Sequence, residues 1–230
     1  LMISKKTGPT DLVTQMDQQV QKDLVEKITH RYPEDRIFAE ENGLRSPISE
    51  GSVWVIDPID GTNNFVTQKE DFAVMVAYFE DGIGQFGLIY DVMRDHLFYG
   101  GGEFPVYRNE VELTPFVDQP LENLLIASNV GMLEKNDWGM ADLGMDSLGI
   151  RVYGSAGISF SKILSGGILA YFSYIWPWDY AAAAIMGEQL GYTVLNLNGD
   201  KPNYQSVEPI MMVPKVKLTE IQTYLKKGRS

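Results

Sequence analysis

Two carboxylates and a hydroxyl follow a short apolar run: Asp57, Asp60 and Thr62 come directly after residues 53–56. This run has the composition of a buried strand, and Pro58 disfavours its continuation. The acidic groups are therefore expected at the carboxyl end of a strand, which faces the ligand crevice in open α/β sheets. Neighbouring carboxylates repel one another unless a cation or proton lies between them, so the turn predicts a metal and phosphate site. The alternative is a surface turn, because Asp, Pro and Gly are common there.

Further carboxylates stand at the ends of other predicted elements. Glu40 follows a predicted strand at 36–39, and Asp179 is placed as the N-cap of a helix that ends near Leu190. Asp17 lies early in a predicted N-terminal helix, where the helix dipole favours negative charge. Capping alone would also explain Asp179. Collected together, these carboxylates form a candidate ligand set for a hard cation.

Oxygen ligands of this kind suit Mg²⁺, which commonly bridges to substrate phosphate. Two such ions could activate a water and stabilise the leaving oxygen in a phosphoryl displacement. The sequence has no recognisable Ser or Cys nucleophile elbow, no Walker loop and no GxGxxG segment. Metal-assisted hydrolysis is therefore the favoured chemistry.

The segment Gly154-Ser155-Ala156-Gly157 lies between a predicted strand and a predicted helix. Its amides could bind an anionic group at the amino end of that helix. Small residues also serve simply for close packing, and that alternative stays open.

Composition narrows the class of protein and its partners. Of the 230 residues 44% are hydrophobic and 22% charged, as in folded globular proteins, and the net charge of −12 disfavours nucleic acid and anionic membranes as partners. Cysteine is absent, which excludes disulfides and fits a reducing cytoplasm. We see neither a secretory signal nor an apolar run of about 20 residues, so a membrane partner is not expected. We expect a cytoplasmic location, and the chain, which starts without Met, to lack a leading segment.

Hydrophobic periodicity predicts two lobes. The first, residues 1–120, would hold an N-terminal helix from about residue 10 to before Pro33, then strands in a mostly antiparallel meander that includes one at 106–113. In the second, residues 121–230, strands alternate with helices, which is typical of an α/β lobe.

The Asp57-Pro58-Ile59-Asp60-Gly61-Thr62 segment, with Glu40-Glu41 upstream and Trp178-Asp179 before an alanine run, resembles the inositol monophosphatase family. The motifs stand in the family's order over nearly the whole chain. The resemblance implies an α+β / α/β fold, a layered αβαβα sandwich. It also implies Mg²⁺ dependence with two or three ions, lithium sensitivity, hydrolysis of phosphate monoesters of small polyols or sugars, and a homodimer.

The resemblance also implies roles for individual residues. Glu40, Asp57 and the Ile59 carbonyl would bind one Mg²⁺, and Asp57, Asp60 and Asp179 a second. The catalytic set would be Asp17, Thr62 and Glu40, with Thr62 and Asp17 orienting a metal-activated water that attacks phosphorus without a phosphoenzyme. Substrate would contact Asp60, Gly61, Thr62, Gly154, Ser155, Ala156 and Asp179, with phosphate on the Gly61 and Thr62 amides. A loop around Lys6 would close over a third metal.

This chain departs from the family at a position that bears on substrate choice. Animal members carry a Glu seven positions before the last metal Asp, where this chain has Phe172. An aromatic side chain there could suit a larger nucleotide substrate. Alternatives to inositol monophosphate are therefore the 2′-phosphate of NADP, fructose 1,6-bisphosphate and 3′-phosphoadenosine 5′-phosphate.

Two other classes of function are open at the level of sequence. A haloacid-dehalogenase-type phosphatase has a DxDGT motif, but its aspartates are one residue apart, whereas two residues separate Asp57 from Asp60. A regulatory binding protein that retains the phosphatase fold is the non-enzymatic alternative.

Overall fold

The computed structural model describes residues 3–5 and 12–227 of the chain. Lys6, with the loop predicted to close over a third metal, lies outside the described residues.

The elements alternate along the chain as follows. The strands are β1 (Ile3–Lys5), β2 (Leu12–Thr14), β3 (Arg36–Ala39), β4 (Ser52–Asp60), β5 (Ala73–Glu80), β6 (Ile83–Asp91), β7 (His96–Gly101), β8 (Phe104–Arg108), β9 (Val111–Glu112), β10 (Leu125–Ser128), β11 (Gly149–Arg151), β12 (Ala170–Ile175), β13 (Tyr192–Asn196) and β14 (Glu208–Pro214). The α-helices are α1 (Gln15–Arg31), α2 (Thr62–Thr67), α3 (Val130–Glu134), α4 (Met140–Asp146), α5 (Ala156–Leu164), α6 (Pro177–Gln189) and α7 (Leu218–Lys227). Short 3₁₀ turns occupy 92–94, 121–123, 137–139 and 215–217.

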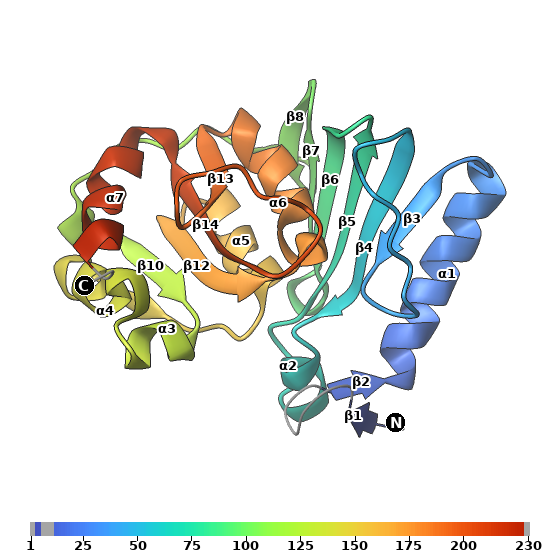
Figure 1. The fold of residues 1–230 in the computed structure, drawn as a ribbon, viewed down its shortest axis with the longest axis horizontal. Coiled ribbons are helices and arrows are strands. Elements are labelled where there is room, and N and C mark those ends of the chain that lie inside the picture. Colours follow the sequence, from blue (N-terminus) through green and yellow to red (C-terminus); the bar gives the residue numbers. More distant parts are fainter. Residues whose placement is uncertain (1–2, 6–11, 228–230) are drawn as a thin grey trace.

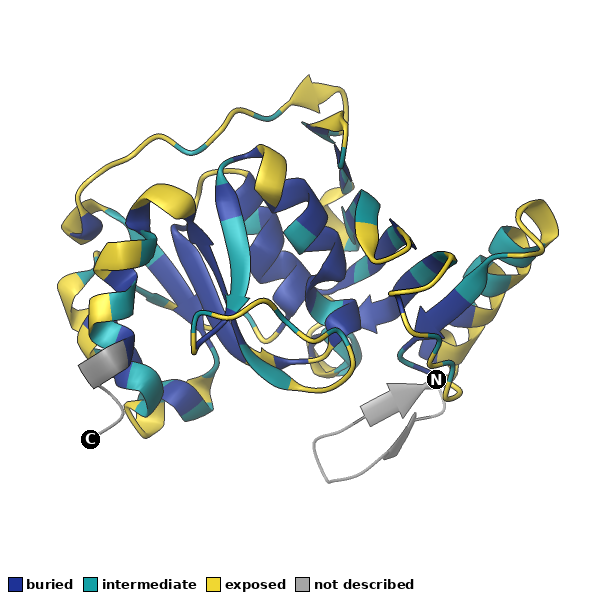
Figure 2. Ribbon diagram, turned by 45° about the horizontal axis from the view of Figure 1, so that its top comes forward, coloured by how far each residue is buried: buried dark blue, intermediate teal, exposed yellow. Residues whose placement is uncertain are grey.

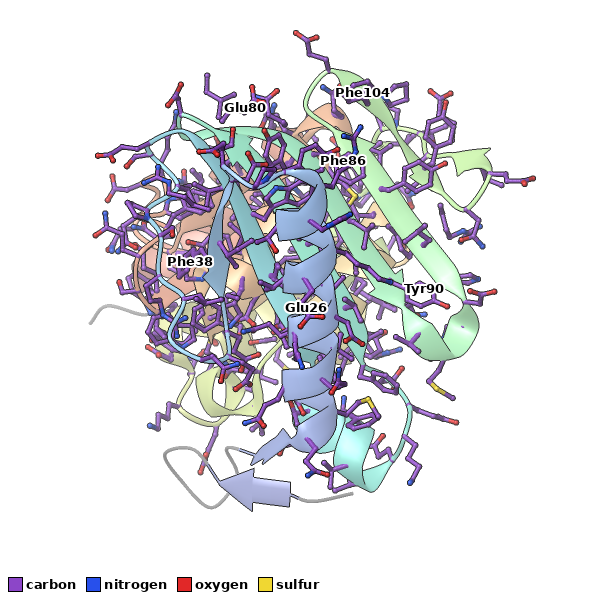
Figure 3. The ribbon with its side chains drawn as sticks, turned by 90° about the vertical axis from the view of Figure 1, so that its right-hand side faces the viewer. Glu26, Phe38, Glu80, Phe86, Tyr90 and Phe104 are labelled. Carbon is purple, nitrogen blue, oxygen red and sulfur yellow. The ribbon has the colours of Figure 1, made fainter. Side chains whose placement is uncertain are left out.

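Five layers stand side by side in Figure 1. Helix α1 covers the outer face of a seven-stranded sheet, α5 and α6 separate this sheet from a five-stranded one, and α3, α4 and α7 cover the far side. Figure 3 shows α1 lying in front of the seven-stranded sheet. The predicted αβαβα sandwich is confirmed.

The seven-stranded sheet has the order β3-β4-β5-β6-β7-β8-β9 and is antiparallel except at one pair. Strands β3 and β4 run parallel, with Ala39 opposite Ile56. The residues that follow, Glu40 after the end of β3 and Asp57 within β4, therefore lie next to each other. This single parallel pair brings two predicted metal ligands together although they are far apart in sequence.

The five-stranded sheet is mixed, with the order β11-β10-β12-β14-β13. Strand β10 is parallel to both of its neighbours, whereas β14 is antiparallel to β12 and to β13. Side chains of β12 alternate between its two faces, so Phe172 faces away from the side that carries Tyr171 and Ser173.

The main core lies between the two sheets, around α5 and α6. Both helices are buried along most of their length (Figure 2). A helix with sheets on both sides needs apolar residues all round, which explains the run Ala181–Ala183 in α6. A second core fills the space between the five-stranded sheet and α4 and α7.

Some predicted boundaries are wrong. Helix α1 begins at Gln15 rather than near residue 10, because Leu12–Thr14 forms β2. The strand predicted at 106–113 is a hairpin of β8 and β9, since its polar centre is a turn with Asn109 at a φ of 54°. Strand β4 passes through Pro58 and ends at Asp60.

The division into lobes at residue 120 stays a prediction. Strands β3–β9 all precede that point and β10–β14 all follow it, but residues from both halves share the main core. Within the described ranges, no helix combines the length and the apolar character that crossing a membrane requires.

Candidate metal and phosphate site

An irregularity in β4 gives Asp57 and Asp60 a common direction. Asp57 pairs with Met75 and Asp60 with Ala73, so three steps along β4 correspond to two along β5. In a regular strand, residues three apart point to opposite faces, and one extra residue in a bulge restores the same face. The pattern of turn residues at Pro58 and Gly61 thus marks a bulged strand end.

Asp179 completes a group of three carboxylates. One ligand oxygen from each of Asp57, Asp60 and Asp179 lies within 4.8 Å of the others. Asp179 is the third residue of α6 and not its N-cap, which is Trp176. The Trp176 amide donates to Asp179 Oδ2 at 2.7 Å, so this carboxylate both caps the helix and faces the other two.

Glu40 lies beside this group. Its amide donates to the Ile56 carbonyl at 3.1 Å, which fixes its backbone next to Asp57. A hydrogen bond between the two carboxyl groups and the negative charge of Glu40 both raise the pKa of Asp57. The structure therefore brings together Glu40, Asp57, Asp60 and Asp179, all predicted as metal ligands.

The electrostatics of the group favour a bound cation. Burial raises the pKa of Asp57 well above 3.8, and the charges of Glu40, Asp60 and Asp179 add to the shift. Burial, followed by the charges of Asp60 and Glu40, also raises the pKa of Asp179. A proton or a hard cation bound among these carboxylates relieves their mutual repulsion. Because Mg²⁺ prefers oxygen ligands, the side chains present fit this ion.

Asp60 is held by the amino end of α5. It accepts hydrogen bonds from the Ser155 hydroxyl, the Ala156 amide at 3.0 Å and the Gly157 amide at 2.7 Å. These donors oppose the effect of burial, which raises the pKa of Asp60 overall. Ser155 also caps α5, accepting from the Ile158 amide at 3.1 Å.

Gly157 belongs to the segment whose amides were predicted to bind an anionic group, and the group that its amide binds is the carboxylate of Asp60. A Cβ at this position would lie 3.0 Å from Asp60 Oδ2 and 2.8 Å from Ala73 Cβ. Only glycine therefore leaves room for the carboxylate. Its place in a small-residue run before a helix was the available signal. The predicted substrate contacts of Gly154, Ser155 and Ala156 stay predictions.

Thr62 and Asp17 are in contact, as predicted. The Thr62 hydroxyl donates to Asp17 Oδ1 at 3.0 Å, and the Ile59 carbonyl is a second acceptor at 3.1 Å. Asp17 is fully buried on α1. Gly61 precedes Thr62 with a φ of 88°, and a Cβ there would lie 2.9 Å from Ser155 Cβ, so a glycine allows this turn.

A cavity of about 250 Å³ opens beside Asp60 and Asp179. Its wall includes Gly154, Ser155 and Ala156, together with four residues that the sequence reasoning missed, Asn129, Tyr171, Ser173 and Ile175. The Asn129 side-chain amide donates to the Ser173 hydroxyl at 3.1 Å.

The interpretation that gave Phe172 a role in substrate choice is wrong. Its side chain is fully buried in the second core, among residues of α4 and α7. Strand alternation instead turns its neighbours Tyr171 and Ser173 toward the cavity.

The layered fold and the buried carboxylate group together define a phosphatase. The chain belongs to the inositol monophosphatase family, whose model matches residues 1–228. This membership places the chain outside the haloacid-dehalogenase type.

Similar proteins agree with this assignment. The chain is 37% identical over 206 residues to an inositol-1-monophosphatase of Bacillus subtilis, covering 87% of this chain and 78% of the relative. The crystal structure of inositol monophosphatase-II from Staphylococcus aureus is 31% identical, with a TM-score of 0.87, covering 95% of this chain and 84% of that one. An IMPase/NADP phosphatase complexed with NADP and Ca²⁺ is 25% identical, with a TM-score of 0.91, covering 100% of this chain and 87% of that one.

The raised pKa values predict that the metal-free protein gains stability on acidification. A carboxyl whose pKa is raised by folding binds its proton more tightly in the folded state than in the unfolded state. Proton binding therefore adds to the free energy of unfolding. This contribution is fully present below the unfolded pKa of 3.8 and is lost as pH rises through the raised pKa of the folded state. Denaturant midpoints in EDTA should therefore rise from about pH 8 to about pH 5.5. Saturating Mg²⁺ should flatten this trend, whereas a metal-free midpoint that falls over the range would contradict the prediction.

Proposed function

We propose that the chain hydrolyses inositol monophosphate to inositol and phosphate in a Mg²⁺-dependent reaction. The observation that carries the proposal is the convergence of Asp57, Asp60 and Asp179 within 4.8 Å, beside the hydrogen-bonded pair Thr62 and Asp17. Capping and local hydrogen bonds account for single members of this group but not for their convergence, since neighbouring buried carboxylates destabilise one another.

The proposed ligand sets are those that the family resemblance implies, and the grouping of Asp57, Asp60 and Asp179 supports the second of them. Glu40, Asp57 and the Ile59 carbonyl would hold one Mg²⁺, and Asp57, Asp60 and Asp179 a second. When bound, Mg²⁺ supplies Lewis-acid polarisation of the phosphoryl oxygens and acidifies a coordinated water.

The residues of the chain would orient the attacking water. Because a hydroxyl has one proton and two lone pairs, Thr62 can donate to Asp17 while its oxygen accepts a hydrogen bond from the water. The buried Asp17 and the Ile59 carbonyl are the two acceptors for the Thr62 proton, which would leave a lone pair of the hydroxyl for the water. The water then attacks phosphorus directly, without a phosphoenzyme.

The substrate would lie between the amino end of α2, at Gly61 and Thr62, and the cavity. The amides of Gly61 and Thr62 would hold the phosphate, and the cavity wall at Gly154, Ser155 and Ala156 would face the alcohol, near Asp60 and Asp179. Two relatives named as inositol monophosphatases support this choice of substrate.

A second candidate substrate is the 2′-phosphate of NADP. The similar structure that holds NADP supports it. Besides Asp60 and Asp179, the cavity is lined by uncharged side chains, among them Asn129 and Ser173, which could serve ribose hydroxyls as well as those of inositol. Fructose 1,6-bisphosphate and 3′-phosphoadenosine 5′-phosphate are further alternatives on this scaffold. A third Mg²⁺, lithium sensitivity, a homodimer and a cytoplasmic location stay predictions.

A substrate panel tests the proposal. Phosphate release should be fastest from inositol 1-phosphate, slower from NADP and fructose 1,6-bisphosphate, and should stop in EDTA and return with Mg²⁺. p-Nitrophenyl phosphate is the control, because its leaving group carries no further hydroxyls. Its hydrolysis reports the metal-dependent reaction without any contribution from binding of a polyol in the cavity. Hydrolysis that persists in EDTA, or no hydrolysis of any monoester, would overturn the proposal.

A further inference from the structure

We propose that Arg45 is a positioning residue that ties the Glu40 segment to the start of α6 and so fixes the distance between Glu40 and Asp179. The inference rests on the proposed function, in which these two residues belong to the metal site. Glu40 follows a strand of the seven-stranded sheet, whereas Asp179 belongs to the helix layer.

The guanidinium of Arg45 closes the turn that carries Glu40. Its Nη1 donates to the Leu44 carbonyl at 3.0 Å and also to the Ala39 carbonyl, and its Nη2 donates to the Glu40 carbonyl at 3.4 Å. Arg45 also forms a backbone bridge with Phe38. Three carbonyls of one turn are thus held by one planar fork of donors, which a lysine cannot reproduce.

The same guanidinium lies over the residue that precedes Asp179. Its Cζ is 4.6 Å from the ring centroid of Trp178, a cation–π distance. Trp178 is almost fully buried. Its ring stacks on Trp176 at 4.8 Å and meets the edge of Phe38 at 5.5 Å. The first turn of α6 is thereby packed against the Glu40 turn.

A second side chain holds the Glu40 turn from the opposite layer. Gln21 of α1, itself buried, donates to the Glu41 carbonyl at 2.8 Å and accepts from the Glu41 amide at 2.8 Å. The turn is thus bound to α1 through Gln21 and to α6 through Arg45. Of these two, Arg45 makes the contact that reaches the Asp179 helix.

Arg45 could instead act only as a charge. Glu40 and Glu41 are near enough to oppose the lowering of the Arg45 pKa by burial. A purely electrostatic role predicts that removing the positive charge strengthens Mg²⁺ binding, because the cation then meets less repulsion. Positioning predicts the reverse, and it also predicts that a lysine does not restore binding.

The test compares Arg45→Ala and Arg45→Lys with the wild type in two measurements. Calorimetric titration with Mg²⁺ in the absence of substrate gives the affinity for the ion. Kinetics give the Mg²⁺ concentration for half-maximal turnover. Both variants should bind Mg²⁺ about five-fold more weakly or worse, and kcat at saturating Mg²⁺ should change by less than about three-fold. Arg36→Ala is the matched control, since Arg36 lies in the same part of the sheet and its guanidinium forms a 3.8 Å ion pair with the exposed Glu50.

Each outcome decides between the roles. Weaker Mg²⁺ binding in both Arg45 variants, with melting temperatures near that of Arg36→Ala, supports positioning. Unchanged or tighter binding in Arg45→Ala, or wild-type binding in Arg45→Lys, overturns it while the proposed function stands. A wild-type protein that neither binds Mg²⁺ nor requires it for turnover overturns both.

Discussion

Replacing Asp57 by Asn is expected to lower kcat/KM on the order of 10³-fold while stabilising the metal-free protein. The charges of Glu40, Asp60 and Asp179 all act on Asp57, which is the ligand that both proposed ions would share. The amide keeps an oxygen that can accept from the Ile59 amide, now 3.1 Å from Asp57 Oδ1. Because it removes a buried negative charge, the free energy of unfolding in EDTA near pH 8 should rise by about 1–2 kcal/mol.

Asp81→Asn is the control for this variant. Asp81 is exposed and accepts from the Gly51 amide at 2.7 Å, a bond that an Asn oxygen can also accept. Its φ of 46° is tolerated by Asn, and it should change neither turnover nor Mg²⁺ dependence. Asp57→Asn activity within about ten-fold of the wild type at saturating Mg²⁺ would remove Asp57 from the metal site.

Replacing Thr62 by Ala is expected to lower kcat by about 10²- to 10³-fold with little change in KM. The hydroxyl that donates to Asp17 is lost, and with it the acceptor proposed to orient the attacking water. Thr62→Ser keeps the hydroxyl and should restore most of the rate. Steady-state kinetics at saturating Mg²⁺ measure both effects.

Thr67→Ala is the matched control in the same helix, because its exposed hydroxyl donates to the Asn63 carbonyl of that helix at 2.7 Å. It should leave kcat unchanged. If Thr62→Ala raised KM alone, Thr62 would act in binding the phosphate and not in the attack of water.

The order of the elements and most of the site could be predicted from the sequence. Apolar runs followed by Asp or Glu predict strand ends at 39–40 and 56–57. The two positions do lie side by side, but only β3 ends there, because β4 continues to Asp60. The Thr62–Asp17 contact followed from resemblance alone, since no local pattern connects a helix side chain to a turn 45 residues away.

What the sequence left out depends on local geometry. Counting seven residues back from Asp179 reached Phe172, but which side chains of β12 face the cavity is set by the alternation of side chains along that strand. The Gly157 amide was expected to bind an anionic group, but that this group is Asp60 could not be predicted, because no local pattern connects residues 60 and 157. Asn129 reaches the cavity only because β10 lies next to β12.

The bulge in β4 also matters to anyone who would build this site elsewhere. Two aspartates three residues apart share a face only because the backbone between Asp57 and Asp60 departs from regular pairing. A designer who grafts the motif onto a straight strand would have to move the aspartates to a spacing of two, and would then have no equivalent of the Ile59 carbonyl at the site. The transferable unit is therefore the bent segment with its partner strand, and not the six letters of the motif.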